Sequence, residues 1–324
     1  MTPGGPGTPS EMRVAAQVAG SESGTRLDVW LGARLPNLSR TRIKELVESG
    51  HVTVDGRQAK AGRRLKVAER VEAFVPPPPP ETLAPEPIAL DVVFEDGDVL
   101  VVDKPAGMVT HPGAGRTEGT LAAAALAHAP EMAGVGGPRR PGIVHRLDKG
   151  TSGLIMLAKT QRAYDALTAA LATRAVKRRY VCLVEGVVRR ERGIVDAPIG
   201  RDPRSRVRMA VAPQGRGKRA VTRFRVLERL AGVTHLQCDL ETGRTHQILV
   251  HLASIGHPIV GDQTYGRRSS AAVPADLVAG LGGVALHAAG LSFAHPVTGV
   301  PIDLMSPVPY RMGRILSHLR CSPR

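Results

Sequence analysis

The sequence has few aromatic residues and few cysteines. Only four Phe, four Tyr and one Trp occur among 324 residues, too few for an RNA-binding protein that stacks successive bases on aromatic side chains. The three cysteines, Cys182, Cys238 and Cys321, are isolated and form no C-x-x-C pair. They predict neither a disulfide framework nor a zinc site, and a reducing cytoplasm is the compartment we expect.

Long hydrophobic runs are also missing. No stretch approaches the roughly 20 apolar residues of a membrane-spanning helix, and the N-terminus lacks the apolar segment of a secretory signal peptide. We therefore expect no membrane association. With 42% hydrophobic residues, the chain can still bury a substantial core, which excludes wholesale disorder.

Acidic residues are outnumbered by basic ones. The chain carries 44 Lys and Arg against 29 Asp and Glu, a formal net charge of +15. The excess is concentrated between Arg174 and Arg225, where 16 basic and 4 acidic residues lie. A basic segment of this kind binds polyanions by releasing their counterions, and RNA is the common case. A solvated basic surface is the alternative that charge alone leaves open.

Composition divides the chain into segments. Residues 1–20 are rich in Gly, Pro and Ser without periodicity, which predicts disorder. The unbroken prolines of Pro76–Pro80 cannot continue a helix or a central strand, which predicts an extended spacer. The expected division is a disordered tail (1–20), a small basic domain (21–75), a proline-rich linker (76–87), a large domain (88–312) and a C-terminal tail (313–324).

The small basic domain has a helix–helix–strand pattern. Apolar residues recur at helical spacing at Leu27, Trp30, Leu31 and Leu35, and again at Ile43, Leu46 and Val47. Ser39 can cap the second helix and Gly50 can end it. Arg40, Arg42 and Lys44 lie on or beside that helix, and a cationic helix face suits contacts to phosphates. Ordinary surface charge on a small domain is the alternative.

The large domain has more strand-like runs than helical patterns. Apolar or alternating runs predict strands at 99–102, 154–158, 180–184 and 221–227, and helical spacing predicts helices at 121–128 and 163–171. Regular crossover helices do not separate the strands. The expected fold is therefore α+β with a mixed, mostly antiparallel sheet.

Asp148 lies where a turn-rich stretch, Gly150–Gly153, leads into an apolar strand. Scaffolds often display reactive groups at such junctions, and the neighbouring Arg146 and Lys149 should favour the ionised carboxylate. A loop aspartate flanked by surface charges is the alternative that the pattern leaves open.

Four motifs, in order along the chain, resemble those of the RluA/RluD-type pseudouridine synthase family. The segment His145–Leu154 (HRLDKGTSGL) is similar to the catalytic motif, Asp103–Gly115 to an upstream motif, Lys177–Tyr180 to the segment with the active-site tyrosine, and Glu241–Ile248 with His257–Asp262 to a downstream motif. The small basic domain resembles the S4 RNA-binding domain.

The resemblance implies an enzyme that isomerises uridines in large-subunit ribosomal RNA, with a synthase-type α+β catalytic domain and a small S4-like α/β domain. Asp148 would be the catalytic carboxylate and Tyr180 would stack on the target base. Arg146 would help to extrude the nucleotide, and His111 and Arg244 would contact RNA.

The implied reaction breaks the N1–C1′ bond and joins C5 to C1′ without a change of oxidation state, so we expect no cofactor and no metal. One ionised carboxylate suffices, either as a nucleophile or by stabilising and deprotonating a sugar-derived intermediate. His246, His251 and His257 lack the carboxylate or thiolate neighbours of a metal site, which favours core and loop roles. Ribosomal RNA is the expected partner, and a monomer is the expected state.

Two residues depart from the family's pattern. Asp103, expected as a polar loop residue, stands where the family has Asn. Leu249 stands where an Arg or Lys pairs with the catalytic Asp. The missing cation favours an alternative, an RNA-binding or ribosome-assembly factor that has lost catalysis. Arg146, Lys149 and Arg244 remain as other sources of positive charge near Asp148.

Overall fold

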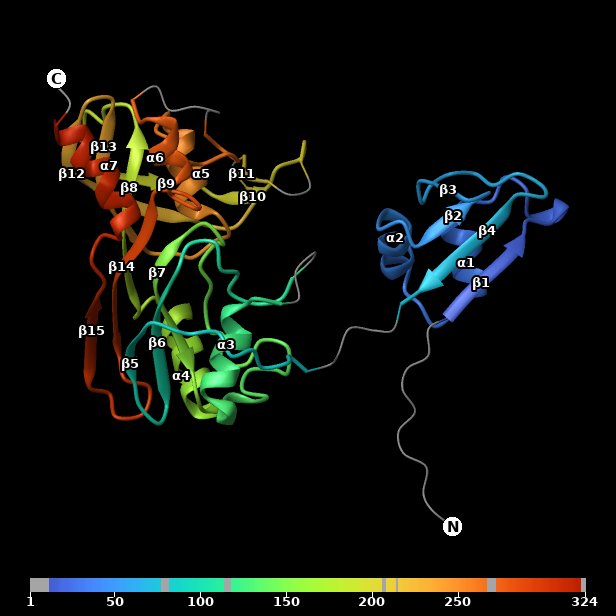
Figure 1. Ribbon diagram of the computed structural model, residues 1–324, viewed down its shortest axis with the longest axis horizontal. Coiled ribbons are helices and arrows are strands. Elements are labelled where there is room, and N and C mark those ends of the chain that lie inside the picture. Colours follow the sequence, from blue (N-terminus) through green and yellow to red (C-terminus); the bar gives the residue numbers. More distant parts are fainter. Residues whose placement is uncertain are drawn as a thin grey trace, which may run out of the picture. The chain divides into compact units, whose positions relative to one another are not determined.

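The computed structural model describes residues 12–76, 82–113, 118–205, 208–213, 215–266 and 272–321 (Figure 1). The chain divides into two compact units, Met1–Glu81 and Thr82–Arg324. Most of the predicted proline run, from 77 to 80, lies outside the described residues.

The first unit combines two helices with a four-stranded sheet in the order β1-β4-β2-β3. Its elements are β1 (Met12–Gln17), η1 (Gly20–Glu22), α1 (Leu27–Arg34), α2 (Arg40–Glu48), β2 (Val52–Val54), β3 (Arg57–Gln58) and β4 (Arg70–Val75). The two helices and the sheet share one apolar core that includes Trp30, Ile43 and Val71. As predicted, the Ser39 hydroxyl caps α2 by accepting a hydrogen bond from the Arg42 amide at 3.2 Å.

The predicted N-terminal tail is wrong in its second half. Met12–Gln17 forms β1, which pairs antiparallel with β4 from Met12 opposite Val75 to Gln17 opposite Arg70. Backbone hydrogen bonds to a strand far along the chain stabilise this segment, and its composition does not reveal that partner. The first eleven residues of the expected tail lie outside the described ranges.

The second unit is built on a nine-stranded sheet in the order β5-β6-β7-β14-β8-β13-β12-β9, with β15 paired to β14. Among the described strands, only β7 and β14 pair in parallel, which confirms the mostly antiparallel α+β fold. Its strands are β5 (Val92–Glu95), β6 (Val99–Lys104), β7 (Ser152–Ala158), β8 (Lys177–Glu185), β9 (Arg192–Asp196), β12 (Val221–Leu230), β13 (Val233–Leu240), β14 (Leu286–Ala294) and β15 (Pro301–Met305). A separate ribbon pairs β10 (Ile199–Arg201) with β11 (Met209–Val211).

Helices cover this sheet on more than one side (Figure 1). They are α3 (Leu121–His128), η2 (Pro130–Met132), α4 (Gln161–Ala172), α5 (Gln247–Ser254), α6 (Ala275–Ala279) and α7 (Tyr310–Cys321). The strand β7 alternates between two apolar clusters, with Ile155 in one and Met156 in the other. Both of its faces are buried, which explains why the 154–158 run is continuously apolar.

The predicted C-terminal tail is also wrong. Residues 310–321 form α7, whose buried face contains Met312, Ile315, Leu316 and Leu319. This spacing places four apolar side chains on one side of a helix, where they join the main core. The predicted domain end at 312 therefore divided a helix that belongs to the fold.

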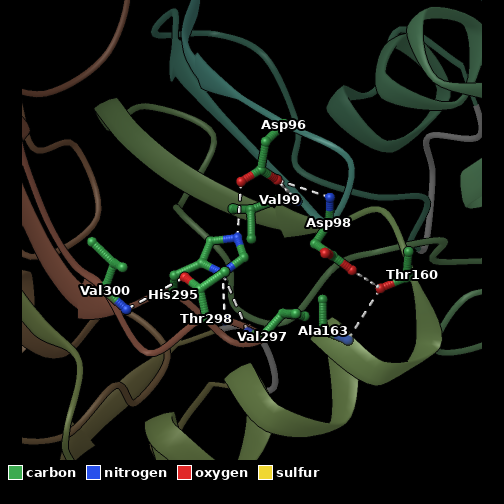
Figure 2. A network of polar contacts seen from close by, with 9 residues as sticks. All are labelled: Asp96, Asp98, Val99, Thr160, Ala163, His295, Val297, Thr298 and Val300. Atoms are coloured by element: carbon green, nitrogen blue, oxygen red, sulfur yellow. Dashed lines mark hydrogen bonds and ion pairs between the residues drawn. The ribbon is translucent and has the colours of Figure 1, made fainter.

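A polar network joins three connections of the second unit (Figure 2). His295 Nε2 contacts Asp96 Oδ2 at 2.8 Å, and the Thr160 hydroxyl donates to Asp98 Oδ1 at 2.7 Å. Thr160 also caps α4 by accepting from the Ala163 amide. None of these residues lines the cavities at Asp148 described below, so we assign the network to the scaffold.

Candidate active site

The backbone after Asp148 is held by close packing. The Thr151 amide donates to the Asp148 carbonyl at 3.0 Å, which closes a turn. Two residues later, Gly153 has a φ of +112°, and its backbone lies directly against Ala288 of β14. Only glycine adopts this conformation readily and leaves room for that approach. The Gly-Thr-Ser-Gly stretch thus fixes the end of the loop that carries Asp148.

Two cavities meet at Asp148. The first, of about 660 Å³, is lined by Asp148 and Tyr180 and by five arginines. We call it the arginine-lined cavity; the arginines are Arg140, Arg146, Arg174, Arg178 and Arg244. The second cavity, of about 900 Å³, is lined by Asp148 together with His246, Leu249 and Asp262.

The arginine-lined cavity brings together most of the predicted site residues. Asp148, Tyr180, Arg146, His111 and Arg244 all line it. Within the described part of the chain, none of its five arginines forms an ion pair with a carboxylate. The cavity therefore combines a carboxylate with cationic groups that remain available to an anionic ligand.

Tyr180 is a wall of this cavity and not an exposed group. It lies on β8 with 5% of its surface exposed. Burial raises the pKa of the Tyr180 phenol, Arg178 opposes the change, and Asp148 adds to it. The phenol is therefore neutral at neutral pH. The same strand residue serves the core and faces the cavity, as an amphipathic ring allows.

The charge on Asp148 is set by opposing influences. Burial raises the pKa of the Asp148 carboxyl, whereas His246, Arg146 and Lys104 lower it and Asp262 raises it further. The net direction is upward, although 24% of the side chain is exposed. The flanking charges in the sequence predicted that Asp148 would ionise easily. Its raised pKa shows that the carboxyl is harder to ionise than that prediction.

Of the three cations proposed from the sequence, Arg146 is among the main influences on Asp148. Lys149 and Arg244 are not among the largest causes of the shift in the Asp148 pKa. Arg244 instead donates its Nε–H to the Arg219 carbonyl at 3.1 Å.

Lys104 is a neighbour of Asp148 that sequence reasoning missed. The side chain is fully buried, and its ammonium donates to the carbonyls of Pro105 and Met108 at 2.8 and 2.9 Å. Burial lowers the Lys104 pKa to about 8, against the attraction of Asp148. The sequence signal that could have identified Lys104 was its position directly before Pro105 in the upstream motif.

His246 is the second missed neighbour. Its Nε2 lies 3.9 Å from Asp148 Oδ1, the shortest contact in the described chain between Asp148 and a nitrogen of a basic side chain. It is the N-cap of α5 in a left-handed conformation, with a φ of +56°. The prediction of a core or loop role for this residue missed its position against Asp148, although it belongs to the downstream motif.

The two departures from the family's pattern have different surroundings. Leu249 is 6% exposed and lines both cavities, so position 249 offers Asp148 no charge. Asp103 is not a loop residue as predicted. It lies in β6, where its Oδ2 accepts a hydrogen bond from the Ser306 hydroxyl, which also contacts His287 Nε2 at 2.9 Å.

The remaining predicted RNA-binding residues lie in the first unit. Arg40 and Lys44 are exposed on α2, and Arg42 is half-buried and paired with Glu45 at 3.4 Å.

Across the described ranges, no three His, Cys, Asp or Glu side chains are grouped to hold a metal ion. No helix in those ranges is long and apolar enough to cross a membrane.

Comparison with known proteins agrees with this geometry. The family described as RNA pseudouridylate synthase matches residues 98–254, and the S4 domain matches residues 25–71. The uncharacterized RNA pseudouridine synthase YlyB of Bacillus subtilis is 42% identical over 91% of this chain and 94% of its own. The ribosomal large subunit pseudouridine synthase D of Xanthomonas campestris is 45% identical over 94% of this chain and 92% of its own.

A solved structure, the human RNA pseudouridylate synthase domain containing 1, covers 72% of this chain and 96% of its own, with a TM-score of 0.54 and 25% identity. The sequence relatives extend over nearly the whole chain, and the structural relative shares its fold over most of the chain. The chain therefore belongs to the RNA pseudouridylate synthase family and carries an S4 domain ahead of its catalytic domain.

Proposed function

We propose that this enzyme converts uridines of large-subunit ribosomal RNA to pseudouridine, with Asp148 as its catalytic carboxylate. The observation that carries the proposal is the position of Asp148 in a cavity whose other charged groups are mainly arginines. Relatives named ribosomal large subunit pseudouridine synthase D, at 42–45% identity, support the choice of substrate. Ribosomal RNA and the free cysteines both fit a cytoplasmic enzyme.

The five arginines suit a flipped nucleotide. A uridine in a stem or stacked loop hides its glycosidic bond, so an enzyme that acts on it must extrude the nucleotide. Guanidinium groups bind the phosphates on either side of the extruded base in bidentate fashion. Arg146 lies two residues before Asp148 and faces the same cavity, which suits the predicted role of filling the vacated space.

Asp148 is the better of two candidate carboxylates. Glu241 also lines the arginine-lined cavity, but its Oε1 forms an ion pair with Arg223 Nη2 at 2.6 Å. Asp148 has no contact with a cation shorter than 3.9 Å in the described chain. Its carboxylate oxygens are therefore available to a substrate, whereas those of Glu241 are held by another residue.

The chemistry requires only what the cavity contains. The N1–C1′ bond breaks, the uracil turns, and C5 bonds to C1′; the C5 proton then leaves to solvent, and N1 takes up a proton. An ionised Asp148 assists by attacking C1′ or by stabilising and deprotonating the sugar. Tyr180, buried and neutral, would form the wall against which the base stacks. The reaction is an isomerisation, so its balance calls for no oxidant or reductant.

The test compares the Asp148→Asn and Asp165→Asn variants on one large-subunit rRNA fragment. We expect Asp148→Asn to lower the single-turnover rate by at least about a thousandfold, with RNA affinity nearly unchanged because shape is retained. Asp165 is exposed on α4 and outside both cavities, so its variant controls for loss of a surface charge. Tritium release from RNA labelled at uridine C5 gives the rate. Appreciable turnover by Asp148→Asn would overturn the assignment.

A further inference from the structure

We propose that His246, in its protonated form, is the positioning residue that pairs with Asp148 and supplies the positive charge that Leu249 does not. The inference rests on the proposed catalytic role of Asp148. In this arrangement, the negative charge of Asp148 is stabilised by a histidine that can lose its proton, and not by a permanently charged arginine.

The contact has the geometry of an ion pair. His246 Nε2 and Asp148 Oδ1 are 3.9 Å apart, and the two side chains are 26% and 24% exposed. The separation is too long for a hydrogen bond, so the attraction acts through charge. Partial shielding from water strengthens such an attraction compared with a pair on the open surface.

The imidazole is oriented by the other side of its ring. His246 Nδ1 contacts the Tyr265 hydroxyl at 2.7 Å, and the two rings meet edge to face at 5.6 Å. The Tyr265 oxygen also accepts the Met209 amide of β11 at 3.0 Å, which anchors it to backbone. A doubly protonated imidazole would donate Nδ1–H to Tyr265 and direct Nε2–H to Asp148, so the charged form uses both nitrogens.

His246 reaches Asp148 from outside the proposed uridine site. It lines the second cavity but not the arginine-lined cavity that contains Tyr180. Asp148 belongs to both. The proposed action of His246 is therefore through Asp148, by holding its rotamer and its negative charge.

Other charges also surround this pair. Arg146 and Lys104 attract the Asp148 carboxylate, and Asp262 repels it. Arg208 lies 5.2 Å from the centre of the Tyr265 ring. Position 249 adds nothing, since Leu249 is apolar and lines both cavities.

The proposal predicts a distinctive dependence on pH. Histidine is the side chain that changes its charge between about pH 5 and 8. The single-turnover rate of the wild type should rise as Asp148 ionises and then fall as His246 loses its proton. An arginine at position 249 would keep its charge throughout. Lys104, with a pKa of about 8, would cause any further fall in more alkaline solution, in every variant.

The experiment measures single-turnover rate against pH for wild type, His246→Gln, Leu249→Arg and the double variant. We expect His246→Gln to lower the rate at pH 7 roughly tenfold, a barrier change of about 1.4 kcal/mol, with RNA affinity unchanged. The double variant should recover most of that rate. Leu249→Arg alone should gain over wild type as pH rises, and all three variants should lack the fall between about pH 6 and 8.

Two further variants keep the test decisive. Tyr265→Phe keeps the ring but removes the hydroxyl that orients His246. We expect it to lower the rate less than His246→Gln does, and to make the fall between about pH 6 and 8 shallower than in the wild type. His128→Gln is the matched control, since it removes a histidine–carboxylate pair, His128 Nε2 to Glu95 at 2.8 Å, that lines neither cavity. It should match the wild type at every pH.

Three outcomes would overturn the inference: an unchanged rate and pH profile for His246→Gln, a loss that Leu249→Arg does not restore, or a fall in rate between about pH 6 and 8 that persists in Leu249→Arg. If His246→Gln fails to fold, the Leu249→Arg and Tyr265→Phe profiles decide alone. Failure of the proposed function has a different signature, either no product from wild-type enzyme or turnover by Asp148→Asn.

Discussion

Gly153 lies so close to Ala288 that a side-chain carbon at position 153 would be 2.5 Å from the Ala288 amide nitrogen. The two residues face each other in the only parallel strand pair of the described sheet. This approach holds β7 against β14 immediately after the loop that carries Asp148.

Gly153→Ala should therefore destabilise the second unit. Both its φ of +112° and the contact with Ala288 oppose a methyl group, and we expect a loss of at least about 2 kcal/mol in the free energy of unfolding. Denaturant titration gives the value. Gly97→Ala is the control, because a methyl group at position 97 would meet no other atom within 4 Å. Equal stability of the two variants would show that β7 and β14 can move apart at Gly153 without loss of stability.

The acid limb of the rate should lie above the range of an ordinary aspartate. Burial raises the Asp148 pKa, so the active carboxylate is lost as pH falls through a value higher than about 3.9. Single-turnover rates from pH 4 to 7 locate this limb. A limb at or below the ordinary aspartate value would contradict the upward shift.

The same upward shift predicts an effect on stability. A carboxyl with a raised folded-state pKa binds its proton more tightly when folded, so its contribution to stability falls as pH rises above the unfolded-state pKa. Asp148→Asn should then be more stable than wild type at neutral pH, with the difference shrinking in acid. Thermal melts at several pH values measure it. A variant less stable than wild type at pH 7 would argue against this sign.

Lys104→Met should move the acid limb of the rate to higher pH. The buried ammonium lowers the Asp148 pKa, and its loss leaves the carboxylate harder to ionise. Lys149→Met is the matched control, since Lys149 is adjacent in sequence but is not among the largest causes of the shift in the Asp148 pKa. Its acid limb should stay in place. A larger shift with Lys149→Met would mean that the chain neighbour, and not Lys104, is the effective charge.

Replacing Arg40 and Lys44 together by Gln should weaken RNA binding and reduce its salt dependence. Both are exposed on α2, and removing a cation that binds a phosphate lowers the slope of log affinity against log salt by roughly one. Arg70→Gln removes an exposed arginine paired with Glu72 at 2.9 Å and serves as the control. An unchanged salt slope for the double variant would assign α2 another role.

The sequence by itself determined the elements whose signals are local. Ser39 caps α2, the alternating and apolar runs form strands, and the linear motif around Asp148 identified the family. These features could be predicted because hydrogen bonds and steric limits between residues near in the chain decide them.

Only the tertiary structure decided which residues surround Asp148. Lys149 is adjacent in sequence yet is not among the main influences on the Asp148 pKa, whereas Lys104 and His246, on distant segments, are. The strand β1 and the helix α7 escaped prediction for a related reason, since each is stabilised by partners far along the chain. Charge and packing depend on distance through space, and the order of strands in a sheet sets that distance without a local signal in the sequence.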